Sequence, residues 1–305
     1  MGTASWNTIG AITTTGEIFI GGITNVFSSV CLGNFTRTKE RWTTTMMVPD
    51  LLGNKIIGIY SGPNHFCAIT EDHQLITWGV NINLMEENSK ISGQLGHTDA
   101  IISTPQYINR SDEWDKIIMV ACGMNHTVLL TTNGVYCFGS NNYSQCTGTS
   151  NPLQIPKYIN KSLFIDNNGI QNIIKHIACG SHFTLALTAN GRVWGWGSNL
   201  FGQLGYSKKL EGDVIATPKL IISPLLEHKS IVNISCGANH SLFLSNKGDL
   251  FSLGSNLFGQ LGIGDPSIQY TSNVHFISYL SDIMIWNVCI FLSFSLFLFS
   301  LFLSL

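Results

Sequence analysis

Three histidines occupy the same place in three copies of a short motif. His65, His126 and His240 each come three residues after the glycine of a Ser-Gly or Cys-Gly dipeptide, in SGPNH, CGMNH and CGANH. Histidine is the side chain best suited to proton transfer and to metal binding near neutral pH. The three belong to different repeats, and each is expected to hydrogen-bond beside its own Cys-Gly turn. We interpret them as structural residues and predict neither a catalytic site nor a metal site.

The eight cysteines have the spacing of neither a metal-binding cluster nor a disulfide framework. Cys122, Cys179 and Cys236 stand at equivalent places in successive copies, about 57 residues apart. A small buried residue would serve at each of these places, and free cysteine behaves as one. We therefore predict reduced thiols in the core.

The glycine-rich segments do not form a phosphate-binding loop. The string SNLFGQLG occurs twice, but the chain contains no Gly-x-x-x-x-Gly-Lys followed by Ser or Thr. The chain is therefore not predicted to be a GTPase itself, and no cofactor is predicted. With 11% charged residues and a net charge of -2, the composition indicates a globular protein without the basic field that nucleic acid attracts.

The candidate residues belong to a repeat that organises the chain. The strings CGSHFTLALTANGRVWGWGSNLFGQLG and CGANHSLFLSNKGDLFSLGSNLFGQLG align without a gap, and looser copies begin at Ser61 and Cys122. The second residues of the four copies, Gly62, Gly123, Gly180 and Gly237, are separated by 61, 57 and 57 residues. A fifth and more divergent copy opens the chain near Ser5. A fixed period of this length is typical of an array of supersecondary units.

Each unit contains four predicted strands. Alternating bulky residues in GRVWGWG and its counterparts indicate a strand with one buried face, and a second strand such as 240–245 precedes it through an NKG or ANG turn. Gly191 and Gly248 in these turns are expected at positive φ. Short segments that begin at a proline, such as 217–221, and the residues before each Cys-Gly, such as 230–235, supply the other two strands. Four strands per unit are typical of a propeller blade.

The combination of Cys-Gly-x-x-His-[Ser/Thr] with a following Gly-x-Asn-x-x-Gly-Gln-Leu-Gly resembles the repeat of the regulator of chromosome condensation family. The resemblance covers about residues 4–288 and implies an all-β propeller that has seven four-stranded blades when complete. About five blades are present, so the propeller is incomplete relative to seven. Their units lie near residues 4–60, 61–121, 122–178, 179–235 and 236–288.

One loop differs from its counterparts. The first well-formed copy carries nine extra residues between Gly79 and Gly93, within INLMEENSKI. Glu86, Glu87 and Asn88 form a predicted acidic tip that could bind a basic patch on a partner. The alternative is a tolerated surface insertion, because long loop insertions cost little stability.

The C-terminal tail, residues 289–305, has two interpretations. No charged residue occurs from Ile283 to Leu305, and 23 residues are enough to span a bilayer. Against a membrane anchor, the repeat stops within a strand, and residues 291–305 are all Phe, Leu or Ser, which pyrimidine-rich codons encode. Membrane spans are usually flanked by Lys or Arg, yet the nearest upstream basic residue is Lys247. We therefore prefer an error at the end of the gene over an anchor.

Three hypotheses for function follow from the architecture and the resemblance. The first is a non-catalytic protein-interaction module, because loops from successive blades suit protein binding. The second, implied by the family, is a guanine nucleotide exchange factor for a Ran-like GTPase. The third is a propeller fragment of a larger ubiquitin ligase or kinase. We expect a monomer in the cytoplasm or nucleus that binds a protein and no nucleic acid directly, with membrane attachment if the tail is genuine.

Overall fold

A computed structural model of the 305-residue chain describes most of the repeat region. The described residues are 2–4, 8–22, 46–48, 55–82, 90–108, 114–148, 150–166, 168–280, 285–289 and 300–303. Within them the regular secondary structure is almost entirely β, and the strands form five four-stranded sheets and one two-stranded sheet.

The five four-stranded sheets follow one another along the sequence. The first contains β1 (Gly2–Ala4), β2 (Thr8–Ile12), β3 (Ile18–Gly22) and β4 (Met46–Met47). The second contains β5 (Ile56–Ser61), β6 (His65–Thr70), β7 (Leu75–Val80) and β8 (Ile101–Tyr107). The third contains β9 (Ile117–Cys122), β10 (His126–Thr131), β11 (Gly134–Gly139) and β12 (Leu153–Ile159). The fourth contains β13 (Ile174–Cys179), β14 (Phe183–Thr188), β15 (Val193–Ser198) and β16 (Val214–Leu220), and the fifth β17 (Ile231–Cys236), β18 (His240–Ser245), β19 (Leu250–Ser255) and β20 (Tyr270–Phe276).

The remaining elements are short. They are η1 (Lys161–Phe164), α2 (Lys208–Glu211), η2 (Pro224–Leu226), η3 (Ser278–Leu280) and the paired strands β21 (Ile285–Cys289) and β22 (Ser300–Leu303). The prediction of four-stranded blades is thus confirmed, and each sheet from the second to the fifth begins with the strand that leads into the Ser-Gly or Cys-Gly dipeptide.

The second and third strands of each sheet form the predicted hairpin. In the fourth sheet β14 and β15 pair antiparallel, from Phe183 opposite Gly197 to Leu187 opposite Val193. Gly191 in the connecting turn has φ +78°, and Gly248 in the fifth sheet has φ +83°. Both predictions of positive φ are confirmed, and the reason is that glycine has no Cβ to clash in this region.

The fourth strand of a sheet begins earlier than the sequence predicts. β16 starts at Val214, four residues before Pro218, so the proline lies inside the strand and not at its start. The pairing of β15 with β16 shifts register between Gly195 and Gly197. Because β16 is the last strand of its sheet, its outer edge needs no partner, and a proline without an N–H is tolerated there.

The inner strands are buried on both faces, whereas the sequence pattern indicated one buried face. Every residue of β14, β15 and β18 except His240 is buried, although polar and small residues alternate with the bulky ones. Thr184 and Ser241 are both fully buried in this way. In the fifth sheet the reason is that one face packs against the fourth sheet and the other against Ile285 of β21, so both faces are removed from water.

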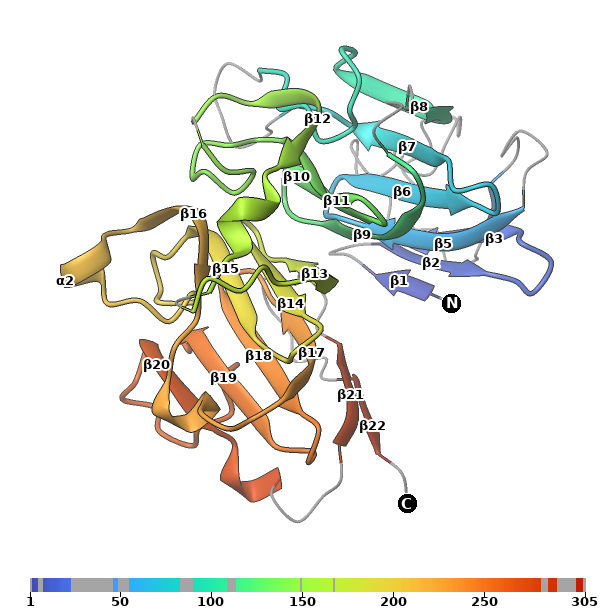
Figure 1. Cartoon of the computed structure of the whole chain (residues 1–305). Helices are drawn as coiled ribbons and strands as arrows, with labels where there is room; N and C mark the ends of the chain where they lie inside the picture. The colour runs from blue at the N-terminus through green and yellow to red at the C-terminus, as the bar shows by residue number, and fades with distance from the viewer. Residues whose placement is uncertain are drawn as a thin grey trace. The chain divides into compact units, whose positions relative to one another are not determined.

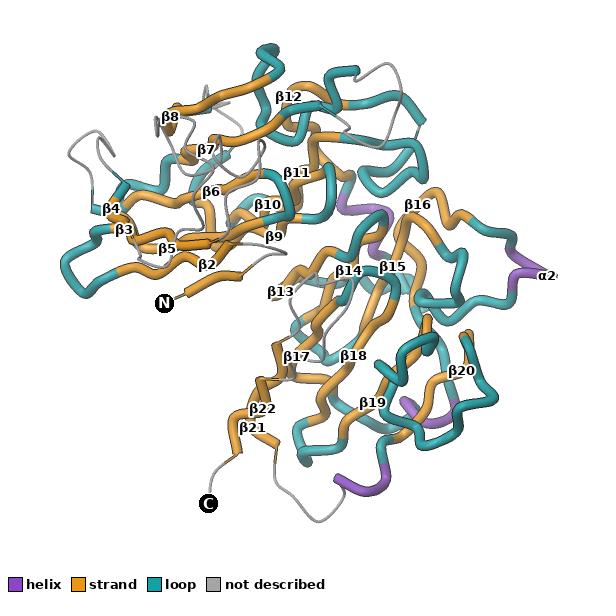
Figure 2. Tube along the Cα trace, turned by 180° about the vertical axis from the view of Figure 1, so that it is seen from behind, coloured by secondary structure: helices purple, strands orange, loops and turns teal. Residues whose placement is uncertain are grey.

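The described chain divides into two compact units. One consists of residues 1–140 and 151–158 and holds the first three sheets, while the other consists of residues 141–150 and 159–305 and holds the last two. Figure 1 shows β17, β18, β19 and β20 side by side in one sheet of the second unit, and Figure 2 shows the same strands from behind. The loop 141–150, which follows β11, thus belongs to the second unit.

Hydrophobic clusters fill the spaces between neighbouring sheets of each unit. Phe183 and Val193 of the fourth sheet lie in one cluster with Phe243 and Leu253 of the fifth. In the first unit, Ile20 of the first sheet lies in one cluster with side chains of the second sheet. Within each unit, neighbouring blades are therefore stabilised by burial against one another, and not by their own sheets alone.

The last two strands continue this pattern at the end of the chain. β21 pairs antiparallel with β22, and Ile285 lies in a cluster with Leu242 and Leu250 of the fifth sheet. Among the described residues, no helix is long and apolar enough to cross a membrane.

Candidate functional site

The repeated histidines fill a space that the neighbouring glycine leaves open. A Cβ on Gly62 would lie 2.5 Å from the His65 ring, and a Cβ on Gly237 would overlap the His240 ring. Phe183 occupies the same place beside Gly180 in the fourth sheet. The position therefore requires a planar ring, and hydrogen bonding is not the shared requirement that the sequence suggested.

Burial also keeps these rings neutral. Desolvation lowers the pKa of His65 to about 3 and the pKa of His240 to about 4. An imidazole that is uncharged near pH 7 and removed from solvent is unsuited to exchanging protons with a surface substrate. The structure thus places these histidines in the frame of the blades.

In the second to fifth sheets, an asparagine side chain holds the loop that follows the third strand. In the fourth sheet, Asn199 Oδ1 accepts from Leu204 N at 3.1 Å, and its Nδ2 donates to Tyr206 O at 2.8 Å. Asn81, Asn141 and Asn256 make the corresponding bonds in the other three loops. These asparagines follow the last glycine of the third strand by two residues, and their bonds fix the loop shape that the glycines permit.

In three of these loops the glutamine also connects the loop to the following sheet. The backbone oxygen of Gln203 accepts from Ser241 Oγ at 2.7 Å. The backbone oxygens of Gln94 and Gln145 accept in the same way from Thr127 at 2.8 Å and from Thr184 at 3.0 Å. The loops are therefore fixed at both ends, so little conformational entropy is lost when they contact a partner.

The predicted acidic tip, Glu86, Glu87 and Asn88, lies outside the described residues. The structure does describe the base of this insertion, where Ile82 and Ile91 form an isolated antiparallel bridge. The segment between β7 and β8 runs from residue 81 to 100, whereas its counterpart between β15 and β16 runs from 199 to 213. The insertion is thus an extension of a loop whose base is ordered.

A second projecting loop, between β15 and β16, was not predicted from the sequence. Figure 1 shows α2 on the loop between β15 and β16, and Leu210 within it is 85% exposed. Lys219 fastens this loop to β16, because its Nζ lies 2.6 Å from a carboxylate oxygen of Glu211 and 4.5 Å from the centre of the Tyr206 ring. The isolated leucine in SKKLEG was the available signal, but exposed single leucines are common.

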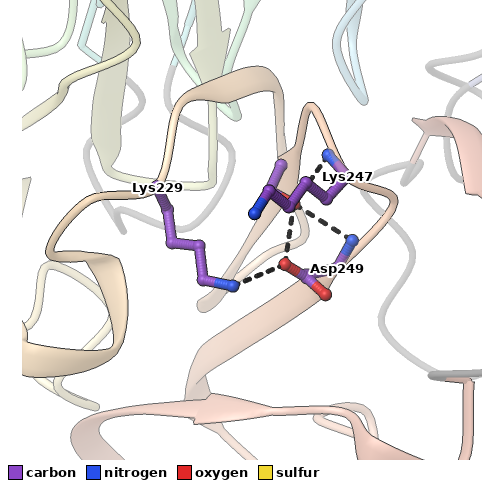
Figure 3. A network of polar contacts seen from close by, with 4 residues as sticks. Lys229, Lys247 and Asp249 are labelled. Carbon is purple, nitrogen blue, oxygen red and sulfur yellow. Dashed lines mark hydrogen bonds and ion pairs between the residues drawn. The ribbon is translucent and has the colours of Figure 1, made fainter.

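An ion pair lies at the β18–β19 turn of the fifth sheet. Lys229 Nζ lies 2.7 Å from Asp249 Oδ2, and Ser245 Oγ donates to the same oxygen at 3.1 Å (Figure 3). The hydrogen bond from Lys229 is the main reason that the pKa of Asp249 is lowered. The backbone N–H groups of Lys247 and Asp249 donate to Ser245 Oγ, so the whole β18–β19 turn is connected to the segment before β17.

The cysteines are only partly as predicted. Cys122, Cys179 and Cys236 are buried and form no disulfide, which confirms that prediction, but Cys137 and Cys146 are disulfide-bonded. The fold explains why these two positions meet. In the fifth sheet the corresponding residues are Ser252 and Leu261, and Ser252 Oγ donates to Leu261 O at 2.8 Å.

A loop that folds back onto its own strand therefore brings residues 137 and 146 together. This contact does not follow the spacing of known disulfide frameworks, so the sequence could not reveal it.

Comparison with known proteins identifies the repeat. The sequence model described as the regulator of chromosome condensation (RCC1) repeat matches residues 72–130, 133–187 and 190–244, which together make up more than half of the chain. The chain belongs to the RCC1 repeat family. A second model of the same repeat matches residues 117–145, 174–203 and 231–260.

Individual relatives agree with this assignment. The ultraviolet-B receptor UVR8 of Arabidopsis thaliana is 32% identical over 218 residues, which cover 70% of this chain and 44% of UVR8. The serine/threonine-protein kinase Nek9 of Xenopus laevis is 30% identical over 226 residues, which cover 71% of this chain and 21% of Nek9. The chain thus spans less than half the length of either relative.

A solved structure supports the fold. The crystal structure of Prp20p from Saccharomyces cerevisiae superposes with a TM-score of 0.78 at 21% identity, and the match covers 95% of this chain and 67% of Prp20p. The fold is accordingly an RCC1-type β-propeller with five four-stranded blades in the described residues.

Proposed function

We propose that this RCC1-repeat chain is a non-catalytic protein-interaction module that regulates its partner, and that the partner is a small GTPase. The observation that carries the proposal is the construction of the loops after the third strands. Asparagine side chains shape them, and glutamine carbonyls bind them to the following blade. Such loops present fixed surfaces, which favours binding because less entropy is lost on association.

The partner class rests on the family and on charge. Prp20p, which shares the fold of this chain, has binding properties to Gsp1p and histones. Glu86 and Glu87 supply two negative charges in a loop longer than its counterparts, which suits a partner with a basic patch.

The runner-up function is guanine nucleotide exchange on a Ran-like GTPase, which family membership favours. An exchange factor must bind the nucleotide-free GTPase more tightly than the nucleotide-bound form, by the same factor by which it weakens nucleotide binding. A plain interaction module binds both forms with similar affinity. A third possibility, a propeller within a larger kinase or ubiquitin ligase, is favoured by the match to part of Nek9.

Two measurements on purified chain separate these functions. The affinity for a panel of small GTPases, Ran-like members included, is measured with GDP bound and without nucleotide, and the release of fluorescent GDP is followed with and without the chain. We expect binding, with similar affinity for both forms and no faster release. Faster release would move the assignment to the exchange factor, and a folded chain that binds no member of the panel would refute the partner class.

The insertion is tested with variants that leave the blades intact. Replacing residues 82–91 with the short connection SNLF of the later repeats, or changing Glu86→Gln with Glu87→Gln, should slow association several-fold at low salt. The matched control removes two exposed charges elsewhere, at Glu71 and Glu227, and should leave association unchanged. Equal effects of the test and control pairs would show that the tip makes no specific contact.

A further inference from the structure

One group of buried side chains in the first unit has the composition of a metal site. An imidazole nitrogen of His65 and the sulfurs of Cys67 and Cys122 all lie within 4.8 Å of one another. His65 and Cys67 alternate along β6 and therefore share a face, while Cys122 ends β9 of the next sheet. Two sulfurs and an imidazole nitrogen are the donors that zinc prefers in proteins.

The separation of the sulfurs fits tetrahedral coordination. Cys67 Sγ and Cys122 Sγ lie 3.7 Å apart. Two thiolates bound to one zinc ion at about 2.3 Å, with a tetrahedral angle between them, lie about 3.8 Å apart. A disulfide instead requires the sulfurs at about 2.05 Å. The observed distance thus matches the edge of a zinc tetrahedron and is too long for a disulfide.

The hydrogen bonds of His65 leave one ring nitrogen as a lone-pair donor. Thr127 Oγ1 donates its proton to Gln94 O at 2.8 Å, so at its 3.0 Å contact with His65 Nε2 the hydroxyl oxygen must accept. Nε2 then carries the hydrogen and Nδ1 carries the lone pair. In the part of the chain that the structure describes, Nδ1 is buried and has no hydrogen-bond partner.

This arrangement is the one that metal-binding histidines use. Their second ring nitrogen donates to a protein acceptor, which fixes the tautomer and the ring orientation. The His65 ring is fully buried, and a buried imidazole without a charged partner stays in the neutral form that ligation requires.

The other repeats show that the cluster is particular to this place. At the position of Cys67 the other three well-formed copies have Val128, Leu185 and Leu242. At the positions of Cys122 and His65, Ser61 and Phe183 occur in one copy each. Each of the three donors is therefore replaced in at least one blade, and their combination is not a requirement of the repeat.

We propose that His65, Cys67 and Cys122 bind one Zn²⁺ ion between the second and third blades. Binding breaks two S–H bonds, forms two Zn–S bonds and releases two protons, without electron transfer. Two thiolates and a neutral imidazole cancel the charge of the ion, so the centre is neutral in an apolar environment, where a net charge would be costly. The fourth position is left to a small exogenous ligand, as in sites with three protein donors.

The test uses the full chain, expressed with added zinc and purified anaerobically under reducing conditions. We expect one zinc ion per chain by elemental analysis. After denaturation with chelator and refolding with Co²⁺, we expect thiolate-to-cobalt charge transfer and the d–d bands of a tetrahedral site. Each ligand is replaced by the residue that another repeat uses, in Cys67→Val, Cys122→Ser and His65→Phe. The control is Cys179→Ser, which removes a thiol outside the cluster.

Each thiol variant should lose the zinc and the cobalt spectrum, the His65→Phe variant should weaken cobalt binding at least tenfold, and the control should keep both. Because three different variants are used, a folding failure of one leaves the others to decide. Zinc retained in both folded thiol variants would overturn the proposal. Two alkylatable free thiols without zinc, or a disulfide between Cys67 and Cys122 in the reduced preparation, would overturn it as well.

Discussion

The shared carbonyl of Gln145 leads to a quantitative prediction about how blades are joined. The oxygens of Gln145 and Gln203 are equivalent, but they differ in their donors. Gln203 O accepts from Ser241 Oγ at 2.7 Å, and the described residues give it no second donor. Gln145 O accepts from Thr184 Oγ1 at 3.0 Å and also from Trp196 Nε1 at 2.8 Å.

The number of donors sets the expected change in the free energy of unfolding. Ser241→Ala leaves a buried carbonyl unsatisfied, which costs about 1–3 kcal/mol. Thr184→Val removes one donor but leaves the indole N–H, so only a net hydrogen bond of about 0.5–1.5 kcal/mol is lost. Both hydroxyl side chains are fully buried, so solvent cannot replace them. We therefore expect Ser241→Ala to be more destabilising by about 1 kcal/mol.

Urea unfolding measures both variants, and an unchanged m-value would show that the same surface is exposed. A double-mutant cycle with Trp196→Phe supplies the control. In that background Thr184→Val should cost about 1 kcal/mol more than in the wild type, because the carbonyl then loses the second of the two donors described above. Equal costs of Thr184→Val and Ser241→Ala, together with additivity in the cycle, would refute this account of the joint.

Three further predictions concern the frame of the blades. Gly254→Ala should lower the free energy of unfolding by about 3 kcal/mol, because φ is +112° and the new Cβ would lie 2.5 Å from a backbone oxygen. The control Gly264→Ala, at φ +73° with nothing within 4 Å of the new Cβ, should cost about 1 kcal/mol in the same urea assay. Lys229→Ala should lower the free energy of unfolding by about 0.2–1 kcal/mol above pH 5 and leave it unchanged once Asp249 is protonated. The reason is that the folded-state pKa of Asp249 is lowered, so the stabilisation is lost as pH falls through that pKa. A cost that persists at pH 2 would argue against the ion pair. Burial lowers the pKa of His65 from 6.5 to about 3, so between these pH values the unfolded state binds one more proton, and the free energy of unfolding falls as pH decreases. In zinc-free protein, His65→Phe should reduce the slope of this free energy against pH by up to about 1.4 kcal/mol per pH unit. An unchanged slope would contradict this prediction.

Many of the strands and turns of the blades could be predicted because each repeat shows the same local sequence pattern. The hairpin turns at Gly191 and Gly248 depend on positive φ, which the sequence signals through the turn segments Ala-Asn-Gly and Asn-Lys-Gly. The alternation of bulky residues marked the inner strands. The family resemblance was confirmed by the match of the RCC1 repeat over more than half of the chain.

The sequence misjudged features that depend on neighbouring sheets. It predicted one buried face for the inner strands, but the fifth sheet packs between the fourth sheet and β21, which hides both of its faces, and so Ser241 is fully buried. It also placed the start of β16 at a proline, although the edge of a sheet tolerates proline within a strand. In each case the deciding factor was a second sheet or a free edge, which local pattern does not encode.

The sequence by itself determined the repeat, its period and the hairpins, because backbone conformation in a turn or strand depends on a few adjacent residues. Only the tertiary structure decided which side chains meet between blades. The sulfur of Cys67 lies 3.7 Å from that of Cys122, 55 residues later, and Gln145 O reaches Trp196 across 51 residues. Contacts between residues so far apart in the sequence depend on how the chain packs in space, so local sequence patterns cannot predict them.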